Sequence, residues 1–201
     1  AGMNSEDKGA PASEAGRGKT WWHQYLTKLR GRASTGPSTV ALGEILWSWV
    51  GAFLGIGALS LLNSNLLAPA DNLLLIGSLG ASAVLVYGAP RSPLARPRNL
   101  VGGHLLSATV GVLCYLLLSP WPWLSAPLAV ATAIALMHLT RTLHPPGGAT
   151  ALIAVAGSDQ VHALGLKFVL MPVGVGVLVL LVVALLVNNL SPQRQSPEHW
   201  Y

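Results

Sequence analysis

The chain has 201 residues, of which 52% are hydrophobic and only 9% are charged, and its mean hydropathy is +0.53. This composition excludes an average soluble globular protein, and the long uncharged runs predict a polytopic membrane protein with a single domain. The net charge of +5 does not indicate nucleic-acid binding, because the basic residues lie outside the apolar runs and form no basic-aromatic platform. The lone cysteine, Cys114, lies in an apolar run and is interpreted as a packing residue.

Three regions are predicted along the chain. Residues 1–39 are a tail whose first part is Gly/Ala/Ser-rich and expected to be disordered. An interfacial helix is predicted near its end, because aromatic, apolar and basic residues recur there as in a segment that lies on lipid: Trp21, Trp22, Tyr25, Leu26, Lys28, Leu29, Arg30 and Arg32. The alternative is a plain flank to the first span. Residues 40–190 form the predicted transmembrane domain, and residues 191–201 a loose polar tail.

The first span, predicted at residues 42–62, has a face of small and polar residues. Glu44, Ser48, Gly51 and Gly55 are spaced by four, three and four positions, which places them on one side of a helix. Small residues let membrane helices approach closely, so this face is predicted to pack against another helix. Glu44 is expected at the membrane interface, with a role in a proton relay as the alternative.

Further spans are predicted at residues 73–89, 100–118, 123–140, 141–157 and 166–190. The second span has only 17 residues, and the helix of the fifth rises about 15 Å, roughly half of a bilayer core of about 30 Å. Breaks are therefore expected at residues 77–80 in the second span and 144–148 in the fifth. The last span is expected to kink at Met171-Pro172.

A weak internal repeat relates the two halves of the chain. Residues 80–85 resemble residues 148–153 at an offset of 68, and residues 110–113 match residues 175–178 at an offset of 65. The common order and similar offsets predict a duplication. The predicted fold is therefore all-α, a polytopic membrane helix bundle of two inverted three-helix repeats with two broken or half-length helices. Six crossings place eleven of the twelve Lys and Arg on the side of the N-terminus, which predicts a cytoplasmic N-terminus.

The segment of residues 144–150, His-Pro-Pro-Gly-Gly-Ala-Thr, organises the functional prediction. His144 and Pro145 are expected to be extended and Pro146 to open a helix, because a residue that precedes proline is pushed out of the helical region. The backbone N–H groups that follow would face an anion at the positive end of the helix dipole. The predicted central anion site thus comprises His144, Gly147, Gly148, Ala149, Thr150 and the repeat partner Ser82. A structural capping role for His144 is the alternative.

The loop at residues 90–99 is the densest cationic stretch between spans. Its arginines satisfy membrane orientation in the simplest interpretation, or they form a funnel for small anions, because guanidinium binds planar oxyanions in a bidentate manner. In the second interpretation Arg98 and Asn99 join the binding site, and Arg91 and Arg96 line the pathway.

Histidines supply the remaining candidates. His104 begins a face of small and polar residues with Ser107, Ala108 and Gly111, which suits helix contact or a pathway lining, and it is assigned to the binding site. His138 and Arg141 are assigned to the pathway, because ionisable groups at membrane depth are functional candidates. A metal site built from three histidines is less favoured, since no acidic or thiolate ligand joins them, and no cofactor is predicted.

These motifs resemble the HPP family of bacterial and plastid membrane proteins. The resemblance rests on the His-Pro-Pro motif with its following Gly-Gly-Ala-Thr-Ala-Leu, on residues 80–85, on Pro90 and residues 92–95, and on Pro97-Arg98-Asn99 and Gly102-Gly103-His104. It covers roughly residues 42–190. The resemblance implies nitrite transport and a place in the bacterial inner membrane. The long N-terminal tail and Thr142-Leu143 depart from the pattern.

Both lines of reasoning predict a transporter for a small monovalent anion, with nitrite implied by the resemblance. Nitrate, formate, bicarbonate or chloride would satisfy the same donors, and no apolar cavity for a large ligand is indicated. A passive anion channel and a non-transporting membrane scaffold are the alternatives. An enzyme is not predicted, because there is no nucleophile-base pair, phosphate loop or cofactor motif. The expected partners are the anion, the lipid bilayer and a second copy of the chain in a homodimer.

Overall fold

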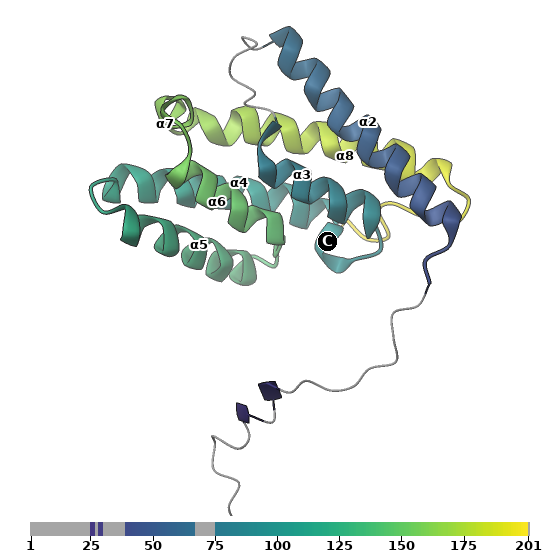
Figure 1. The fold of residues 1–201 in the computed structure, drawn as a ribbon, viewed down its shortest axis with the longest axis horizontal. Helices are drawn as coiled ribbons and strands as arrows, with labels where there is room; N and C mark the ends of the chain where they lie inside the picture. The colour runs from purple at the N-terminus through teal and green to yellow at the C-terminus, as the bar shows by residue number, and fades with distance from the viewer. Residues whose placement is uncertain (1–24, 27, 30–38, 67–74, 201) are drawn as a thin grey trace, which may run out of the picture. The chain divides into compact units, whose positions relative to one another are not determined.

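A computed structural model of the chain describes residues 25, 26, 28, 29, 39–66 and 75–200. Residues 40–201 form one compact unit, and its described part is built from helices without strands (Figure 1). The helical elements of that part are α2 (Leu42–Leu66), α3 (Gly77–Ala83), η3 (Val84–Gly88), η4 (Pro93–Ala95), α4 (Pro97–Leu118), α5 (Pro122–Leu139), α6 (Pro145–Ala156), α7 (Asp159–Leu164), η5 (Val169–Gly174) and α8 (Val175–Leu190).

Four helical segments are long and apolar enough to cross a membrane, at Leu42–Asn65, Pro97–Leu118, Pro122–Leu139 and Val169–Leu190. Two shorter apolar helices, Gly77–Gly88 and Pro145–Ala156, lie between them in the chain. Each shorter helix has 12 residues, which is a rise of about 18 Å against a bilayer core of about 30 Å. The prediction of two half-length helices in an all-α membrane bundle is confirmed.

The structure changes two details of these short helices. The helix α3 begins at Gly77 and runs through Gly80, and its geometry changes to a π-helix only at Val84, so the break expected at residues 77–80 is wrong. The helix α6 begins at Pro145 instead of Pro146, while His144 is extended with φ −140° and ψ 105°. Two consecutive prolines are compatible with the first turn because neither needs a helical N–H partner there.

Apolar segments that follow one another in the chain run in opposite directions, so every second segment runs the same way. The helices α4 and α6 run parallel, because Gly103 approaches His144 and Gly111 approaches Ala151 further along both helices. The α3–η3 segment runs parallel to α8, since Leu79 lies against Gly176 and Val86 accepts a hydrogen bond from Asn188. The helix α2 runs antiparallel to α8, because its first turn lies near the end of α8, where Arg194 binds Glu44, and Figure 1 shows that the two helices cross at an angle.

This alternation brings the starts of α2, α4 and α6 and the ends of η3, α5 and α8 to one end of the bundle. We call it the basic end, because it carries Arg91, Arg96, Arg98, Arg141 and Arg194. Six segments that each cross the membrane in turn would have to alternate in direction in this way. The inverted relation of the two halves and the cytoplasmic location of the basic end stay predictions.

The predicted face of α2 is the face that packs. Gly51 and Gly55 are buried against the ring of Tyr87, and a Cβ atom added at Gly51 would lie 2.6 Å from Cδ1 of that ring. The Tyr87 hydroxyl donates to the Leu180 carbonyl oxygen at 3.1 Å. The three elements α2, η3 and α8 are therefore joined around one buried tyrosine.

Two further predictions concern helix packing and shape. The face of α4 from His104 to Gly111 packs on α6, where a Cβ atom added at Gly111 would lie 2.6 Å from the Ala151 carbonyl oxygen.

The kink at Met171-Pro172 is confirmed, because Met171 has the non-helical φ of −142° and ψ of 121°. A proline interrupts the helical hydrogen bonds at such a position.

The predictions for the two terminal segments can be compared with the structure to different extents. Trp21, Trp22, Arg30 and Arg32 of the predicted interfacial helix lie outside the described residues, whereas residues 25, 26, 28 and 29 are helical and exposed. The prediction of a loose C-terminal tail is wrong at Arg194, which is 6% exposed. A charged side chain withdrawn from water to this degree needs fixed partners, and these partners hold the tail.

Candidate functional site

Four of the predicted site residues form one buried polar cluster. Ser82 comes from α3, His104 from α4, His144 precedes α6 and Thr150 lies in α6, and each of the four is 0% exposed. Ser82 Oγ lies 2.6 Å from His104 Nε2 and 2.9 Å from His144 Nε2. His104 Nδ1 lies 2.7 Å from Thr150 Oγ1. The two half-length helices thus meet one long helix through hydrogen-bonding side chains, and we call this set the central cluster.

The partners of the central cluster fix the direction of its hydrogen bonds. His144 Nδ1 lies 2.9 Å from the Leu94 carbonyl oxygen, which only accepts, so His144 donates from Nδ1. A neutral His144 then accepts at Nε2 from Ser82, and Ser82 in turn accepts from His104 Nε2. This leaves His104 Nδ1 to accept from Thr150. The neutral cluster is a single chain of donors that runs from Thr150 to the Leu94 carbonyl.

This assignment predicts different tautomers for the two imidazoles. At pH 7.5 we expect His144 to carry its proton on Nδ1 and His104 to carry its proton on Nε2, because each tautomer is imposed by a fixed partner. Solid-state NMR of ¹⁵N-histidine-labelled protein in lipid distinguishes the protonated from the bare nitrogen of each ring. The same tautomer for both rings would contradict the derived chain of hydrogen bonds.

The start of α6 offers fewer backbone donors than the sequence indicated. Pro145 and Pro146 have no N–H group, and the Gly147 N–H donates to the His144 carbonyl oxygen at 2.8 Å. Gly147 is buried against α4, Gly148 is half-buried and Ala149 is exposed. The prediction that the N–H of Gly147 is free is wrong, because the first turn closes on His144. The buried donors and acceptors at this helix start are the side chains of His144 and Thr150.

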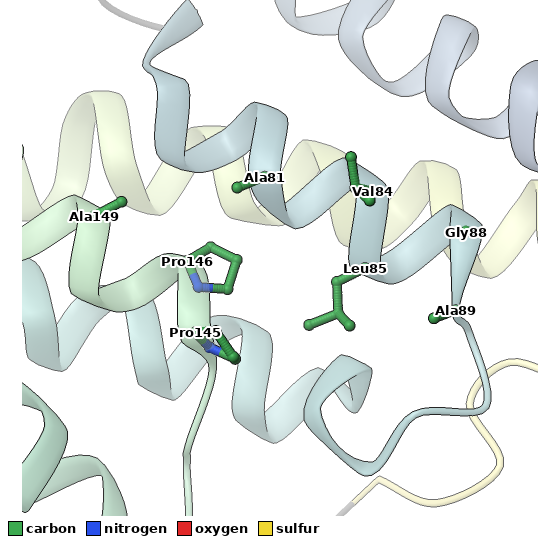
Figure 2. A pocket seen from close by; sticks show the side chains of 8 residues that line it. All are labelled: Ala81, Val84, Leu85, Gly88, Ala89, Pro145, Pro146 and Ala149. Atoms are coloured by element: carbon green, nitrogen blue, oxygen red, sulfur yellow. The ribbon is translucent and has the colours of Figure 1, made fainter. Parts of the chain in front are cut away.

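An apolar groove lies on the other side of the contact between α3 and α6. It has a volume of about 540 Å³, and Figure 2 shows its lining: Ala81, Val84, Leu85, Gly88, Ala89, Pro145, Pro146 and Ala149. Ala81, Pro145 and Ala149 are direct chain neighbours of the central cluster but face away from it. The groove therefore lies outside the central cluster, and the side chain of Ala149 belongs to the groove.

Arg98 and Asn99 hold the turn that leads into α6. Arg98 is exposed and its Nη2 donates to the Thr140 carbonyl oxygen at 2.6 Å, while the Asn99 amide donates to the Leu143 carbonyl oxygen at 2.8 Å. Carbonyl groups at a helix C-terminus lack helical partners, and basic side chains bind them well. Both predicted residues therefore lie beside the central cluster, where they position His144, and their side chains are outside it.

The predicted pathway residues stay at the surface of the basic end. Arg91 is exposed, donates to the Gln193 carbonyl oxygen at 2.6 Å and lies 3.7 Å from Glu198. His138 and Arg141 are exposed, and Arg96 is half-buried at the start of α4. The structure does not gather these side chains around the central cluster. Their part in a pathway stays a prediction.

Sequence reasoning missed a second buried polar set, around Arg194. Its guanidinium donates to Glu44 Oε2 at 2.8 Å and to Ser48, Asn188 and the carbonyl groups of Glu44 and Tyr87 at 2.8–3.1 Å. Glu44 lies in the first turn of α2, as expected for an interfacial acid. The available signal was an arginine close to the end of the last span, six residues after Asn188 and near the predicted interface.

Metal chemistry finds little support in the side chains present. Within the described ranges, no three His, Cys, Asp or Glu side chains are grouped so that they could hold a metal ion. The central cluster contributes two imidazoles and two hydroxyls. Hydroxyls and neutral imidazoles donate hydrogen bonds, so the arrangement suits a hydrogen-bonded ligand or a proton.

The fold and this cluster define a polytopic α-helical membrane protein whose half-length helices enclose polar side chains. The chain belongs to the HPP transmembrane family, whose profile matches residues 37–197. It is similar to two transmembrane proteins of Dictyostelium discoideum, with 43% identity over 186 residues and 42% over 182 residues. These matches cover 91% and 89% of this chain but only 59% and 64% of the relatives, so the chain spans about three fifths of their length. No solved structure matches the chain.

Proposed function

We propose that this protein transports a small monovalent anion across the membrane, with nitrite as the first candidate. The observation that carries the proposal is the central cluster, because two half-length helices deliver fully buried hydroxyl and imidazole groups to one place inside a membrane bundle. Polar side chains at membrane depth are costly, which makes them candidates for a pathway or a binding site. Discontinuous helices that meet near the midplane are typical of secondary transporters.

The charge distribution favours an anion over a cation. Residues 72–158 contain no Asp or Glu, yet they include four arginines and three histidines. This stretch contains α3, η3, η4, α4, α5 and α6, and therefore every element that contributes to the central cluster. A region lined by charges of one sign raises the local concentration of ions of the opposite sign. A cation would find no carboxylate in these elements.

The central cluster is small and fully buried, which favours a small anion and requires a conformational change for its access. All four side chains are withdrawn from the surface, so an ion reaches them only after one of the elements that enclose the cluster shifts. The neighbouring groove is apolar and offers no polar side chain to an anion (Figure 2). Nitrite is named first because of the resemblance described above, and nitrate, formate, bicarbonate and chloride compete as substrates.

Uptake by the purified protein in proteoliposomes tests this proposal. Nitrite, nitrate, formate, bicarbonate and chloride are each offered outside, with protein-free liposomes as the reference. Saturable uptake of one or more anions is the expected result. Flux that rises linearly with anion concentration, without saturation, would instead indicate a passive channel. Uptake no faster than in protein-free liposomes for all five anions would support the remaining alternative, a non-transporting membrane scaffold.

Removal of one cluster hydroxyl should weaken anion binding strongly. Thr150→Val and Ser82→Ala delete a hydroxyl at nearly constant volume, and a hydrogen bond to a charged group is worth about 1.5 to 3 kcal/mol. We therefore expect the half-saturating concentration to rise by roughly ten- to a hundredfold in each variant. Ser78→Ala is the matched control, because Ser78 is 0% exposed on the same helix and its Oγ has no hydrogen-bond partner. Equal affinities in all three variants would place the anion elsewhere.

A further inference from the structure

The hydroxyls of the central cluster each have a second acceptor. Ser82 Oγ lies 3.1 Å from the Ser78 carbonyl oxygen, and Thr150 Oγ1 lies 3.3 Å from the Pro146 carbonyl oxygen. Both carbonyls belong to the residue four positions earlier in the same helix, which is a common alternative partner for Ser and Thr. Each hydroxyl hydrogen can therefore turn from an imidazole to a backbone carbonyl while every heavy atom keeps its place.

The turn of Ser82 creates room for one extra proton on His144. With its hydrogen on the Ser78 carbonyl, Ser82 Oγ still has two lone pairs. It then accepts from Nε2 of His104 and from Nε2 of a protonated His144, which continues to donate from Nδ1 to the Leu94 carbonyl. The same arrangement of atoms thus satisfies every hydrogen bond of the cluster with and without the added proton.

The turn of Thr150 extends this property to His104. With Thr150 donating to Pro146, His104 donates from Nδ1 to Thr150 and accepts at Nε2 from Ser82. From the resting tautomers, a proton that reaches His104 Nδ1 through Thr150 passes on when Ser82 Oγ takes the Nε2 hydrogen of His104 and gives its own hydrogen to the bare Nε2 of His144, which leaves His104 protonated on Nδ1. The reverse transfer starts from this Nδ1 form and returns the proton to His104. In each direction one N–H and one O–H bond break, one O–H and one N–H bond form, and no oxidant or reductant is needed. The route leads from His144 at the basic end to Thr150, about 9 Å further along α6.

The surroundings leave an added proton without a protein counter-charge. The elements that supply the cluster bring no carboxylate, because residues 72–158 lack Asp and Glu. Of the elements that contact them, α2 carries Glu44, which is paired with Arg194, and α7 carries Asp159, which is exposed. The other charged groups of residues 72–158 are basic: Arg91, Arg96, Arg98, His138 and Arg141. The remaining titratable side chains of this stretch are Tyr87 on η3 and Cys114 and Tyr115 on α4. Arg98 is engaged with the Thr140 carbonyl, and His138 and Arg141 are exposed. A buried charge without a partner is costly, so a protonated cluster favours a bound anion.

We propose that the central cluster is a proton site and relay that couples the entry of one proton to each transported anion, so that transport is an electroneutral symport. The proposal rests on the anion transport proposed above. The Ser82 hydroxyl is the element that switches between the two states, and the anion supplies the negative charge that the cluster lacks.

The coupling is tested on the wild-type protein in proteoliposomes at pH 7.5, with nitrite as the probe. The membrane potential is clamped with potassium and valinomycin, and the flux in protein-free liposomes is subtracted. For a tenfold nitrite gradient, net flux should vanish when an opposing gradient of about one pH unit is applied, because the two gradients are then equal in free energy. We call the pH gradient at which net nitrite flux vanishes the balance point. It should be unchanged when the clamped potential is altered, because an electroneutral symport moves no net charge.

Two outcomes separate this inference from the function on which it rests. Saturable nitrite uptake whose balance point follows the membrane potential and ignores the pH gradient would overturn the coupling and leave transport intact. Uptake that does not exceed that of protein-free liposomes for any anion of the panel would overturn the proposed function itself.

Variants then test the assigned atoms. His144→Asn keeps a donor for the Leu94 carbonyl but removes the nitrogen that takes the extra proton, so the number of protons moved per nitrite should fall at least tenfold. Ser82→Ala should lower the same ratio, and it serves as the second variant if the first does not fold. Ser78→Ala keeps the carbonyl acceptor and should keep the wild-type ratio. An unchanged ratio in folded His144→Asn or Ser82→Ala protein would contradict the relay.

Discussion

Replacement of Arg194 by methionine should destabilise the protein by about 3 to 5 kcal/mol, because it leaves buried polar partners without their ion. The side chain of Arg194 is 1% exposed and that of Glu44 is 31% exposed. The guanidinium joins the start of α2 to the end of α8 and binds the Tyr87 carbonyl at the end of η3. Methionine has a similar length but no donor, so these acceptors would be buried without partners. Unfolding by SDS titration in mixed micelles measures the loss.

Arg91→Met provides the matched control for this prediction. The side chain of Arg91 is 68% exposed and its ion pair with Glu198 is long, at 3.7 Å. Exposed pairs of this kind contribute about 0 to 1 kcal/mol, so the control should stay within that range of the wild type. Equal stabilities of the two variants would mean that the polar contacts of Arg194 do not hold the bundle together.

The comparison between the two arginines also shows where sequence reasoning stops. Both lie at the basic end next to apolar segments, and both satisfy the charge rule for membrane orientation. Only the path of the chain after α8 brings Arg194 back to Glu44, 150 positions earlier in the sequence. Local composition contains no information on such a distant contact, which is why a loose tail was predicted.

The central cluster was predictable in its members and unpredictable in its bonding. Ser82 and Thr150 were paired through the repeat, and His104 and His144 through their place in apolar segments, because polar residues at membrane depth are rare enough to stand out. The arrangement of the bonds depends on the Leu94 carbonyl, which lies 50 residues before His144 and has no sequence signature. The backbone donors of Gly147 were overestimated, since the sequence does not reveal that the first turn of α6 closes on His144.

Spans were predicted well where length and hydropathy decide and less well where two helices must fit together. The half-length helices follow from the shortness of their apolar runs. The face that each helix packs against its neighbour depends on the volumes of the side chains at the contact. The two adjacent glycines of α6 demonstrate this. Gly148 was predicted as a residue of the anion site, and a Cβ atom added there meets only Val130 Cγ1, at the ordinary contact distance of 3.9 Å.

Gly147 and Gly148 should therefore respond to alanine with opposite signs. At Gly147 an added Cβ atom would lie 2.9 Å from the Gly103 carbonyl oxygen and 2.8 Å from Ser107 Oγ. The carbonyl belongs to the backbone of α4 and cannot move aside without a shift of the helix. Overpacking of this kind costs about 1 to 3 kcal/mol, and it should push α6 away from α4 and weaken the contact between His104 and Thr150.

Gly148→Ala should instead stabilise α6 by about 0.5 to 1 kcal/mol, because alanine loses less conformational freedom in a helix than glycine does and the site has room for a methyl group. SDS titration compares the unfolding of the two variants, and nitrite uptake follows the site. Uptake should fall in Gly147→Ala and be retained in Gly148→Ala, since only the former disturbs the packing of α4 on α6 beside the central cluster. A Gly147→Ala protein as stable as Gly148→Ala would show that α4 and α6 are not in close backbone contact.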